Sequence, residues 1–313
     1  MSIVAAVFPG QGAQRKGMAS DFHERFPEAH HVFEVASDAL SFNVAEICHR
    51  DDPRLDMTEF TQPCILTAEI AMLESLKKHF GFKPEYFGGH SLGEYAALVA
   101  AGAIPFDIAV RLVHIRGKLM QSSAPLGMGG MAAVIMENLP RDEIIKETEK
   151  AGVDIANDNS PMQIVISGEK NKVDALCLAL STKYSDRGIR VVPLVVSAPF
   201  HSRHMKEVEK KFGNVLKEHG DSFAADKAAC VTSNFTGTFH KGSREDIVDA
   251  LTRQISGRVR WRDNMAAIMD KSKNIFEIGP NRPLGGFFKA CGISVQSIID
   301  VRSAERALSK ATV

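Results

Sequence analysis

The chain lacks an excess of charge of either sign. Its 313 residues include 38 Lys and Arg and 38 Asp and Glu, so the formal net charge at pH 7 is zero. A balanced chain creates no long-range field that would attract nucleic acid or an anionic membrane. We therefore expect neither a nucleic acid nor a membrane among its partners.

Paired cysteines and long apolar runs are also missing. The five cysteines lie far apart and none forms a C-x-x-C pair, which argues against a disulfide framework and against a zinc site. No stretch approaches the roughly 18 apolar residues of a membrane span, and no basic segment precedes the short apolar run at the start. These absences predict a soluble, cytoplasmic protein without a bound metal.

The sequence does contain the strand and helix patterns of an α/β protein. Residues 3–8 form a short apolar run that ends at Pro9-Gly10, as in a strand buried on both faces of a parallel sheet. A weaker run ends at residue 89, and the stretch 94–101, rich in Ala, Leu and Glu, predicts a helix after it. Later runs predict further strands of the same sheet, at 228–234, 274–280 and 294–300.

The segment between residues 127 and 196 has a different pattern. Strand-like and helix-like stretches follow one another there in the order β, α, β, β, α, β, which is typical of a small ferredoxin-like unit. We expect residues 127–196 to form a subdomain inserted into a large α/β domain, which residues 1–126 and 197–313 would make.

A candidate nucleophile lies between the second predicted strand and its helix. Residues 89–93 read G-x-S-x-G, and the glycines allow the sharp turn that would expose Ser91. The N–H groups at the start of the helix would face the negative charge that develops during acyl transfer. A Gly-Ser-Gly turn can also be purely structural, but the strand and helix around it favour Ser91 as a nucleophile.

A serine nucleophile needs a base within hydrogen-bond reach, and two histidines are candidates. His201 follows the apolar run 191–200, so it should lie beyond the carboxyl end of a strand, where catalytic groups of open α/β sheets collect. His90 is the rival because it adjoins Ser91, although a neighbour on a sharp turn generally points away from the nucleophile. Spacing gives His201 a modest advantage only.

Arg116 occupies a core-facing position on a predicted helix. Apolar residues recur at helical spacing over 108–120 and form one broad arc, and Arg116 lies in its middle. A buried guanidinium is costly unless an anion pairs with it. Two interpretations stay open from the spacing: a structural arginine that pairs internally or reaches out to water, and a binding group for an anionic substrate.

Four motifs occur in order along the chain: FPGQGAQ at 8–14, GHSLGEYAAL at 89–98, RGKLMQ at 116–121 and SAPFHSRHM at 197–205. Together they resemble the malonyl-CoA:acyl carrier protein transacylases, which include acyltransferase domains of fatty acid and polyketide synthases. The resemblance covers essentially the whole chain. It implies a large α/β-hydrolase-like domain with a parallel sheet and an inserted ferredoxin-like βαββαβ subdomain.

The resemblance also implies catalytic roles. Ser91 would be acylated, and His201 would be its base. The backbone N–H groups of Gln11 and Leu92 would form the oxyanion hole. A backbone carbonyl near Gln254, in place of a carboxylate, would orient the histidine.

The same resemblance implies how the substrate is held. Arg116 would grip the free malonyl carboxylate, with Gln62 close by, so an acetyl group would leave the buried cation unpaired. Phe200 resembles the bulky residue of malonyl-selective members, which crowds the position of an α-methyl branch. We also expect Met120 to contact the substrate.

The predicted function is transfer of a malonyl group from malonyl-CoA to the phosphopantetheine thiol of an acyl carrier protein, through a malonyl-serine intermediate. This reaction supplies extender units for fatty acid or polyketide synthesis and needs no metal or other cofactor. We expect a monomer. Two rivals stay open: a serine hydrolase or thioesterase, which would have no use for Arg116, and a non-catalytic docking module, which would not need Ser91, His201 and Arg116.

Overall fold

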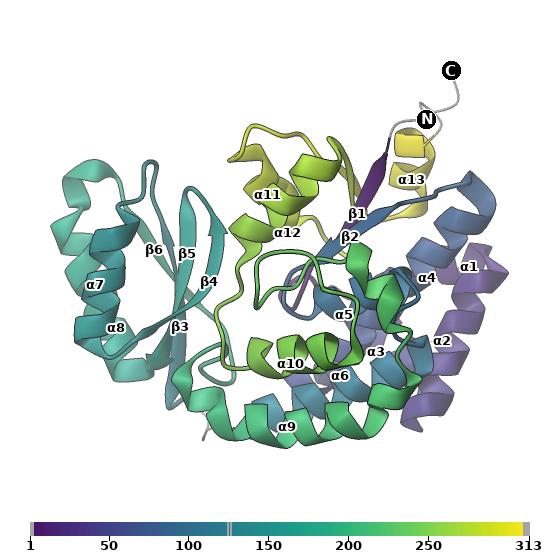
Figure 1. Cartoon of the computed structure of the whole chain (residues 1–313), viewed down its shortest axis with the longest axis horizontal. Helices are drawn as coiled ribbons and strands as arrows, with labels where there is room; N and C mark the ends of the chain where they lie inside the picture. The colour runs from purple at the N-terminus through teal and green to yellow at the C-terminus, as the bar shows by residue number, and fades with distance from the viewer. Residues whose placement is uncertain (1–2, 124, 126, 309–313) are drawn as a thin grey trace.

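A four-stranded parallel sheet organises the larger part of the computed structural model, which describes residues 3–123, 125 and 127–308 (Figure 1). The strand order is β2 (Tyr86–Gly89), β1 (Val4–Phe8), β7 (Asn274–Ile278) and β8 (Gln296–Ile298). Ala6 and Phe8 of β1 pack into the main core, and Ala5 and Val7 face a second cluster around Trp261. The expectation of a strand buried on both faces is therefore confirmed.

Helices pack on both faces of this sheet and complete the larger unit. They are α1 (Ser20–Arg25), α2 (Pro27–Leu40), α3 (Val44–His49), α4 (Thr58–Phe80), α5 (Gly93–Ala100), α6 (Phe106–Gln121), α9 (Lys206–His219), α10 (Arg244–Gln254), α11 (Trp261–Lys271), α12 (Pro283–Lys289) and α13 (Val301–Leu308). Short 3₁₀ turns of this unit occur at Pro53–Asp56, Arg203–Met205, Gly220–Ser222 and Ala225–Cys230, and one in the smaller unit at Ser185–Arg187.

An antiparallel sheet forms the smaller unit, at the left of Figure 1. Its elements follow in the order β3 (Gly129–Ile135), α7 (Arg141–Ala151), β4 (Asp154–Ser160), β5 (Gln163–Glu169), α8 (Lys170–Lys183) and β6 (Arg190–Leu194). The strands lie side by side as β4, β5, β3, β6. The predicted βαββαβ order is confirmed, and with it the fold class of a parallel α/β sheet accompanied by a ferredoxin-like unit.

Alternation along the strands gives the smaller sheet two different faces. Ala132, Val134 and Ile166 pack with residues of α7 and α8 in a core of their own. Their neighbours Met131 and Ala133 point the other way and line a cleft against the larger unit. The smaller sheet thus contributes one wall of that cleft.

One strand predicted from the sequence is wrong. Residues 228–230 belong to a 3₁₀ turn, and Val231 and Thr232 form only isolated bridges, to Phe87 and Phe239. The backbone pairing with β2 does not continue beyond these residues, because the Asn234 N–H donates to the side chain of Glu94, at 2.9 Å from Oε2. The apolar pattern of 228–234 reflects burial beside β2 without a full strand.

The expected division into residues 1–126 with 197–313 and an insertion of 127–196 stays a prediction, and its boundary at residue 126 lies outside the described residues.

Within the described ranges the five cysteines are free thiols. No group of three or more His, Cys, Asp or Glu side chains in those ranges is arranged to hold a metal ion. None of the described helices combines the length and apolarity needed to cross a membrane.

Glu69 is a buried carboxyl group in the core of the larger unit. It lies on α4 and is 0% exposed, and neither side-chain oxygen has a hydrogen-bond partner among the described residues. Burial, followed by the nearby carboxyl of Glu277, raises the pKa of Glu69 well above its usual range. Burial without a hydrogen-bond partner therefore favours the protonated, neutral form of Glu69 in the folded protein.

We expect Glu69→Gln to raise the melting temperature at about pH 8 by a few degrees. The folded-state pKa of Glu69 lies above the unfolded-state value, so between the two values the folded chain binds more protons and stability falls as pH rises. Glutamine does not titrate, so the gain should shrink at about pH 5. Thermal unfolding of both proteins at both pH values checks this. The same difference in melting temperature between Glu69→Gln and the unsubstituted protein at about pH 8 and at about pH 5 would contradict it.

Candidate active site

Ser91 lies in the tight turn between β2 and α5. Its φ of 52° is in the left-handed region, which residues other than glycine rarely adopt. The flanking glycines are required by close backbone contacts: a Cβ on Gly89 would lie 1.9 Å from the Gly93 carbonyl oxygen, and one on Gly93 would lie 2.2 Å from that of Phe8. The turn therefore projects the serine hydroxyl away from the sheet.

Asn234 supports this turn and was not found by sequence reasoning. It is fully buried, its Oδ1 accepts from the Ser91 N–H at 2.8 Å, and its Nδ2 donates to the Gly89 carbonyl at 2.7 Å. These two bonds link both ends of the strained turn. No motif pointed to Asn234, because the segment around it carries the apolar pattern of a strand.

His201 is placed against Ser91 as a base should be. The Ser91 hydroxyl donates to His201 Nε2 at 2.8 Å, and His201 Nδ1 donates to the backbone carbonyl of Gln254 at 2.8 Å. Because the carbonyl only accepts, Nδ1 carries the proton and Nε2 is free to accept one. Burial lowers the pKa of His201 to about 3, and the charge of Arg116 acts in the same direction.

The rival histidine points elsewhere. His90 Nε2 bonds Asn159 Oδ1 at 2.8 Å, and its ring meets the ring of Trp261 edge-on at 5.7 Å. Asn159 belongs to β4 of the smaller sheet, so His90 joins the two units and does not serve the serine.

Arg116 is buried as the apolar arc predicts, with 1% exposure. Its Nη1 donates to Gln62 Oε1 at 2.8 Å, and Nη2 donates to Gln254 Oε1 at 2.9 Å and to Ser91 Oγ at 3.1 Å. Nε has no partner among the described residues. The acceptors are all neutral oxygens, so a buried cation faces the nucleophile without a carboxylate bound to it.

The loop after β1 brings Gln11 beside the Ser91 turn. The His90 N–H donates to the Phe8 carbonyl at 2.9 Å, and a Cβ on Gly10 would lie 2.3 Å from the His90 carbonyl oxygen. Within the described ranges, neither the Gln11 nor the Leu92 backbone N–H has an acceptor in the protein. Both amides are thus free to bind an oxygen of a ligand.

A cleft of about 1030 Å³ lies between the two units and contains these groups. Met120 and Phe200 line it, and Gln62 Nε2 lies 3.8 Å from Met120 Sδ; that Met120 and Phe200 contact a substrate stays a prediction. The opposite wall comes from the four strands of the smaller sheet, β3, β4, β5 and β6. Ser91, His201 and Arg116 therefore all line the same cleft.

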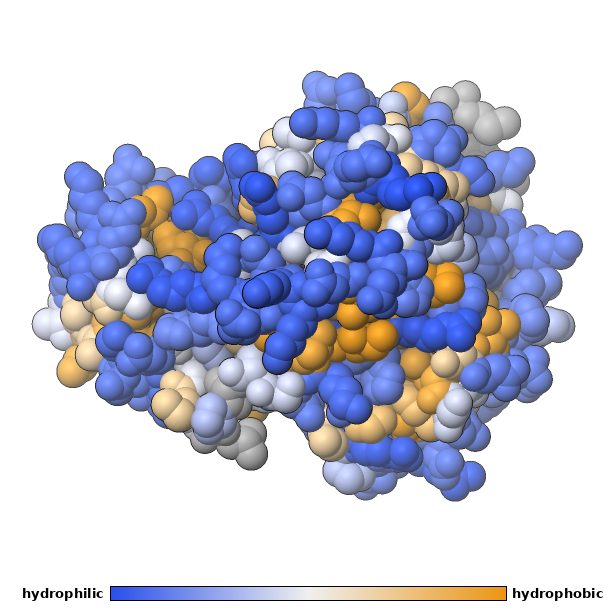
Figure 2. Space-filling view, turned by 60° about the horizontal axis from the view of Figure 1, so that its bottom comes forward, coloured by the Kyte–Doolittle hydropathy of each residue, from blue (hydrophilic) through white to orange (hydrophobic). Residues whose placement is uncertain are grey.

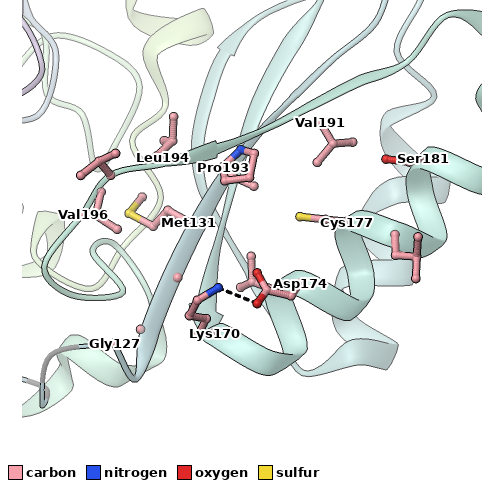
Figure 3. A pocket seen from close by; sticks show the side chains of 16 residues that line it. Gly127, Met131, Lys170, Asp174, Cys177, Ser181, Val191, Pro193, Leu194 and Val196 are labelled. Carbon is pink, nitrogen blue, oxygen red and sulfur yellow. Dashed lines mark hydrogen bonds and ion pairs between the residues drawn. The ribbon is translucent and has the colours of Figure 1, made fainter.

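A second hollow, on the smaller unit, is different in character (Figure 3). It lies between β6 and α8, where the charges of Lys170 and Asp174 pair with each other at 2.6 Å. Burial raises the pKa of the Cys177 thiol there, so the thiol stays protonated and is a poor nucleophile. Among the described residues that line this hollow, none has a hydroxyl or thiol in contact with a histidine, as Ser91 has with His201.

Comparison with known proteins agrees with this geometry. The acyl transferase domain family matches residues 6–276. The malonyl CoA-acyl carrier protein transacylase of Staphylococcus aureus (strain MRSA252) is 35% identical over 312 residues, which cover 96% of this chain and 98% of that protein. The chain belongs to the malonyl-CoA:acyl carrier protein transacylase family. The family member of Bacillus subtilis (strain 168) is 36% identical over 303 residues, 95% of this chain and 93% of that protein.

Solved structures of family members share the fold. The crystal structure of the Clostridium perfringens transacylase superposes with a TM-score of 0.89 at 36% identity and covers 99% of this chain and 97% of that one. A malonyl-transacylase bound to a type II PKS acyl-carrier protein, PlMCAT:AntF, superposes with a TM-score of 0.91 at 36% identity, over 99% of this chain and 100% of that chain. The family resemblance of the four motifs is therefore confirmed.

Proposed function

We propose that this chain transfers a malonyl group from malonyl-CoA to the phosphopantetheine thiol of an acyl carrier protein, with Ser91 as the covalent carrier. The observation that supports this proposal best is the guanidinium of Arg116. It is buried, its hydrogen-bond acceptors among the described residues are all neutral oxygens, and its Nη2 lies 3.1 Å from the Ser91 hydroxyl. A carboxylate at the far end of the acyl group would supply the anion that this cation lacks.

The first half-reaction loads the serine. His201 Nε2 takes the hydroxyl proton as Ser91 Oγ attacks the thioester carbonyl of malonyl-CoA. The oxyanion of the tetrahedral intermediate is held by the N–H groups of Gln11 and Leu92. The C–S bond then breaks, the coenzyme A sulfur receives the proton from His201, and a malonyl-serine ester remains.

The second half-reaction repeats these steps in reverse order. The phosphopantetheine thiol gives its proton to His201 and attacks the ester carbonyl, and the Ser91 oxygen leaves with that proton. Arg116, next to Gln62, retains the malonyl carboxylate throughout, while Met120 and Phe200 bound the space around the acyl group. Malonyl-acyl carrier protein is the product, and it would serve as an extender unit in fatty acid or polyketide synthesis.

The rival hydrolase shares Ser91 and His201 but has no role for Arg116. A hydrolase gains nothing from a buried cation that selects an acidic acyl group and excludes a neutral one. A docking module without catalysis would not need the 2.8 Å bond between the Ser91 hydroxyl and His201. The geometry of these three residues favours the transferase.

The carrier protein is the proposed macromolecular partner, by analogy with the relative that was solved in complex with an acyl-carrier protein. Figure 2 views the molecule from the side of α9, and hydrophilic side chains cover most of that face, with apolar residues in smaller patches. A cytoplasmic location, a monomeric state and a division at residues 127 and 196 complete the proposal.

A direct test mixes the protein with a panel of acyl-CoAs and a phosphopantetheinylated carrier protein and measures the mass of the carrier. We expect malonyl transfer to exceed acetyl transfer by on the order of 10²-fold or more, because acetyl leaves the buried cation unpaired. Release of free malonate without a change in carrier mass would support the hydrolase and contradict the proposal.

The pH profile of loading should lack an acid limb near the ordinary histidine pKa. The pKa of His201 falls from 6.5 to about 3 through burial and the charge of Arg116, so the base stays unprotonated in mild acid. We expect kcat/KM for malonyl-CoA to stay nearly constant from about pH 8 to about pH 5. In Arg116→Ala, assayed with acetyl-CoA, the loss of activity in acid should begin at a higher pH, because the charge of Arg116 is one cause of the low pKa of His201. A limb near 6.5 in the unsubstituted protein would contradict this prediction.

A further inference from the structure

Glu94 is a buried carboxylate close to the nucleophile, and the mechanism above does not use it. It lies on α5 with 0% exposure. Its Oε1 receives His240 Nε2 at 2.9 Å, and its Oε2 receives Gln254 Nε2 at 2.7 Å and the Asn234 N–H at 2.9 Å. A buried carboxylate with every contact satisfied is well determined in position.

His240 supplies the charge that balances this carboxylate. Its ring lies between two acids, with Nδ1 at 3.2 Å from Asp246 Oδ2 and Nε2 at 2.9 Å from Glu94 Oε1. A neutral imidazole has only one N–H and can donate to only one of them, so the geometry requires the protonated ring. Burial acts against the charge, but the hydrogen bonds to Asp246 and Glu94 prevail and raise the pKa of His240 to about 9.

The side-chain amide of Gln254 lies between Glu94 and the guanidinium of Arg116. Its Nε2 donates to Glu94 Oε2 and to the Ser91 carbonyl at 3.1 Å, and its Oε1 accepts from Arg116 Nη2 at 2.9 Å. Turning the amide over would place oxygen against a carboxylate and an NH₂ group against a cation. Glu94, which is the nearer acceptor, acts together with the Ser91 carbonyl to set which end of the amide faces Arg116.

We propose that Glu94 is a positioning residue for Arg116: through the Gln254 amide it presents an oxygen to Nη2 and holds the guanidinium toward Ser91. The ion pair of Glu94 is made with His240, so Glu94 directs Arg116 without neutralising it. The charge of Arg116 stays available to a substrate carboxylate. This inference rests on the proposed function, because the carboxylate in question is that of the malonyl group.

Two substitutions at Glu94 separate positioning from simple stability. Glu94→Gln keeps an oxygen for Gln254 Nε2, so the ratio of kcat/KM for malonyl-CoA to that for acetyl-CoA should stay within about threefold of the unsubstituted protein. Glu94→Met removes the nearer acceptor of Gln254 Nε2. Transfer from malonyl-CoA should then slow because its carboxylate binds a misplaced Arg116, whereas acetyl-CoA has no carboxylate and should be affected less, so the ratio should fall about tenfold or more. Glu69→Gln, an equally buried carboxyl outside this network, is the matched control and should leave the ratio unchanged.

Gln254→Met tests the same link if Glu94→Met does not fold. It keeps the backbone carbonyl that receives His201 Nδ1 and removes only the amide, and the ratio should fall about tenfold as well. A ratio equal to that of the unsubstituted protein in either methionine variant, with both substrates slowed in proportion, would overturn the inference. An unsubstituted protein that transfers no malonyl group would instead overturn the proposed function.

Discussion

Ser91→Ala is expected to abolish the malonyl adduct and carrier loading together. In the proposed mechanism the hydroxyl oxygen of Ser91 forms the ester, and among the described residues that line the cleft no other hydroxyl or thiol contacts a histidine as Ser91 contacts His201 Nε2 at 2.8 Å. Loss of a nucleophile of this kind typically costs on the order of 10⁴- to 10⁶-fold in rate. Intact-protein mass spectrometry after mixing with malonyl-CoA, followed by a carrier-loading assay, measures both effects.

Ser122→Ala is the matched control, because Ser122 is an exposed serine at the end of α6 that bonds only backbone carbonyls. It should acquire one malonyl group as the unsubstituted protein does. His201→Ala should load slowly but on the same residue, since the hydroxyl remains while the base is lost. A malonyl adduct in Ser91→Ala at the normal rate would show that the covalent carrier is another residue.

The second large effect is expected from Arg116→Ala, which should remove most of the preference for malonyl-CoA over acetyl-CoA. A buried cation paired with a substrate carboxylate is worth several kcal/mol, so kcat/KM for malonyl-CoA should fall on the order of 10²-fold or more. Acetyl transfer should change far less, because acetyl never engages the guanidinium. Competition between the two acyl-CoAs, with mass detection of the loaded carrier, measures the ratio directly.

Arg111→Ala on the same helix is the control for this experiment. Arg111 is exposed and pairs with Asp107 one turn away at 2.7 Å, so its removal should not alter the ratio. Arg116→Lys should fall between the two, because a lysine keeps the charge but cannot reach Gln62, Gln254 and the carboxylate with one planar group. If Arg116→Ala keeps the preference for malonyl, the carboxylate-binding role of Arg116 must be dropped.

The sequence already contained the parts of the site that depend on local pattern. The turn at Ser91 could be predicted because close packing forces glycine at positions 89 and 93, and the burial of Arg116 could be predicted because helical periodicity places it among apolar residues. Its position after an apolar run gave His201 only a modest advantage among the eleven histidines, until the family motifs singled it out.

Other parts could not be found from local pattern. Asn234 lies in a segment that resembles a strand, yet its side chain bridges the turn around Ser91. The role suggested for Glu94 depends on His240, a residue far away in the chain, with no spacing rule to connect them. Hydrogen bonds of this kind join groups whose separation in sequence carries no information about their separation in space.

Periodicity, glycine placement and motif order along the chain were enough to predict the βαββαβ order of the smaller unit, the tight serine turn and the membership of the family. The folded arrangement was needed to show that the Ser91 hydroxyl contacts His201 and not His90, and that the acceptors of Arg116 among the described residues are all neutral oxygens. Hydrogen bonding and charge balance at a buried site depend on all the groups that surround it, and those groups come together only when the chain folds.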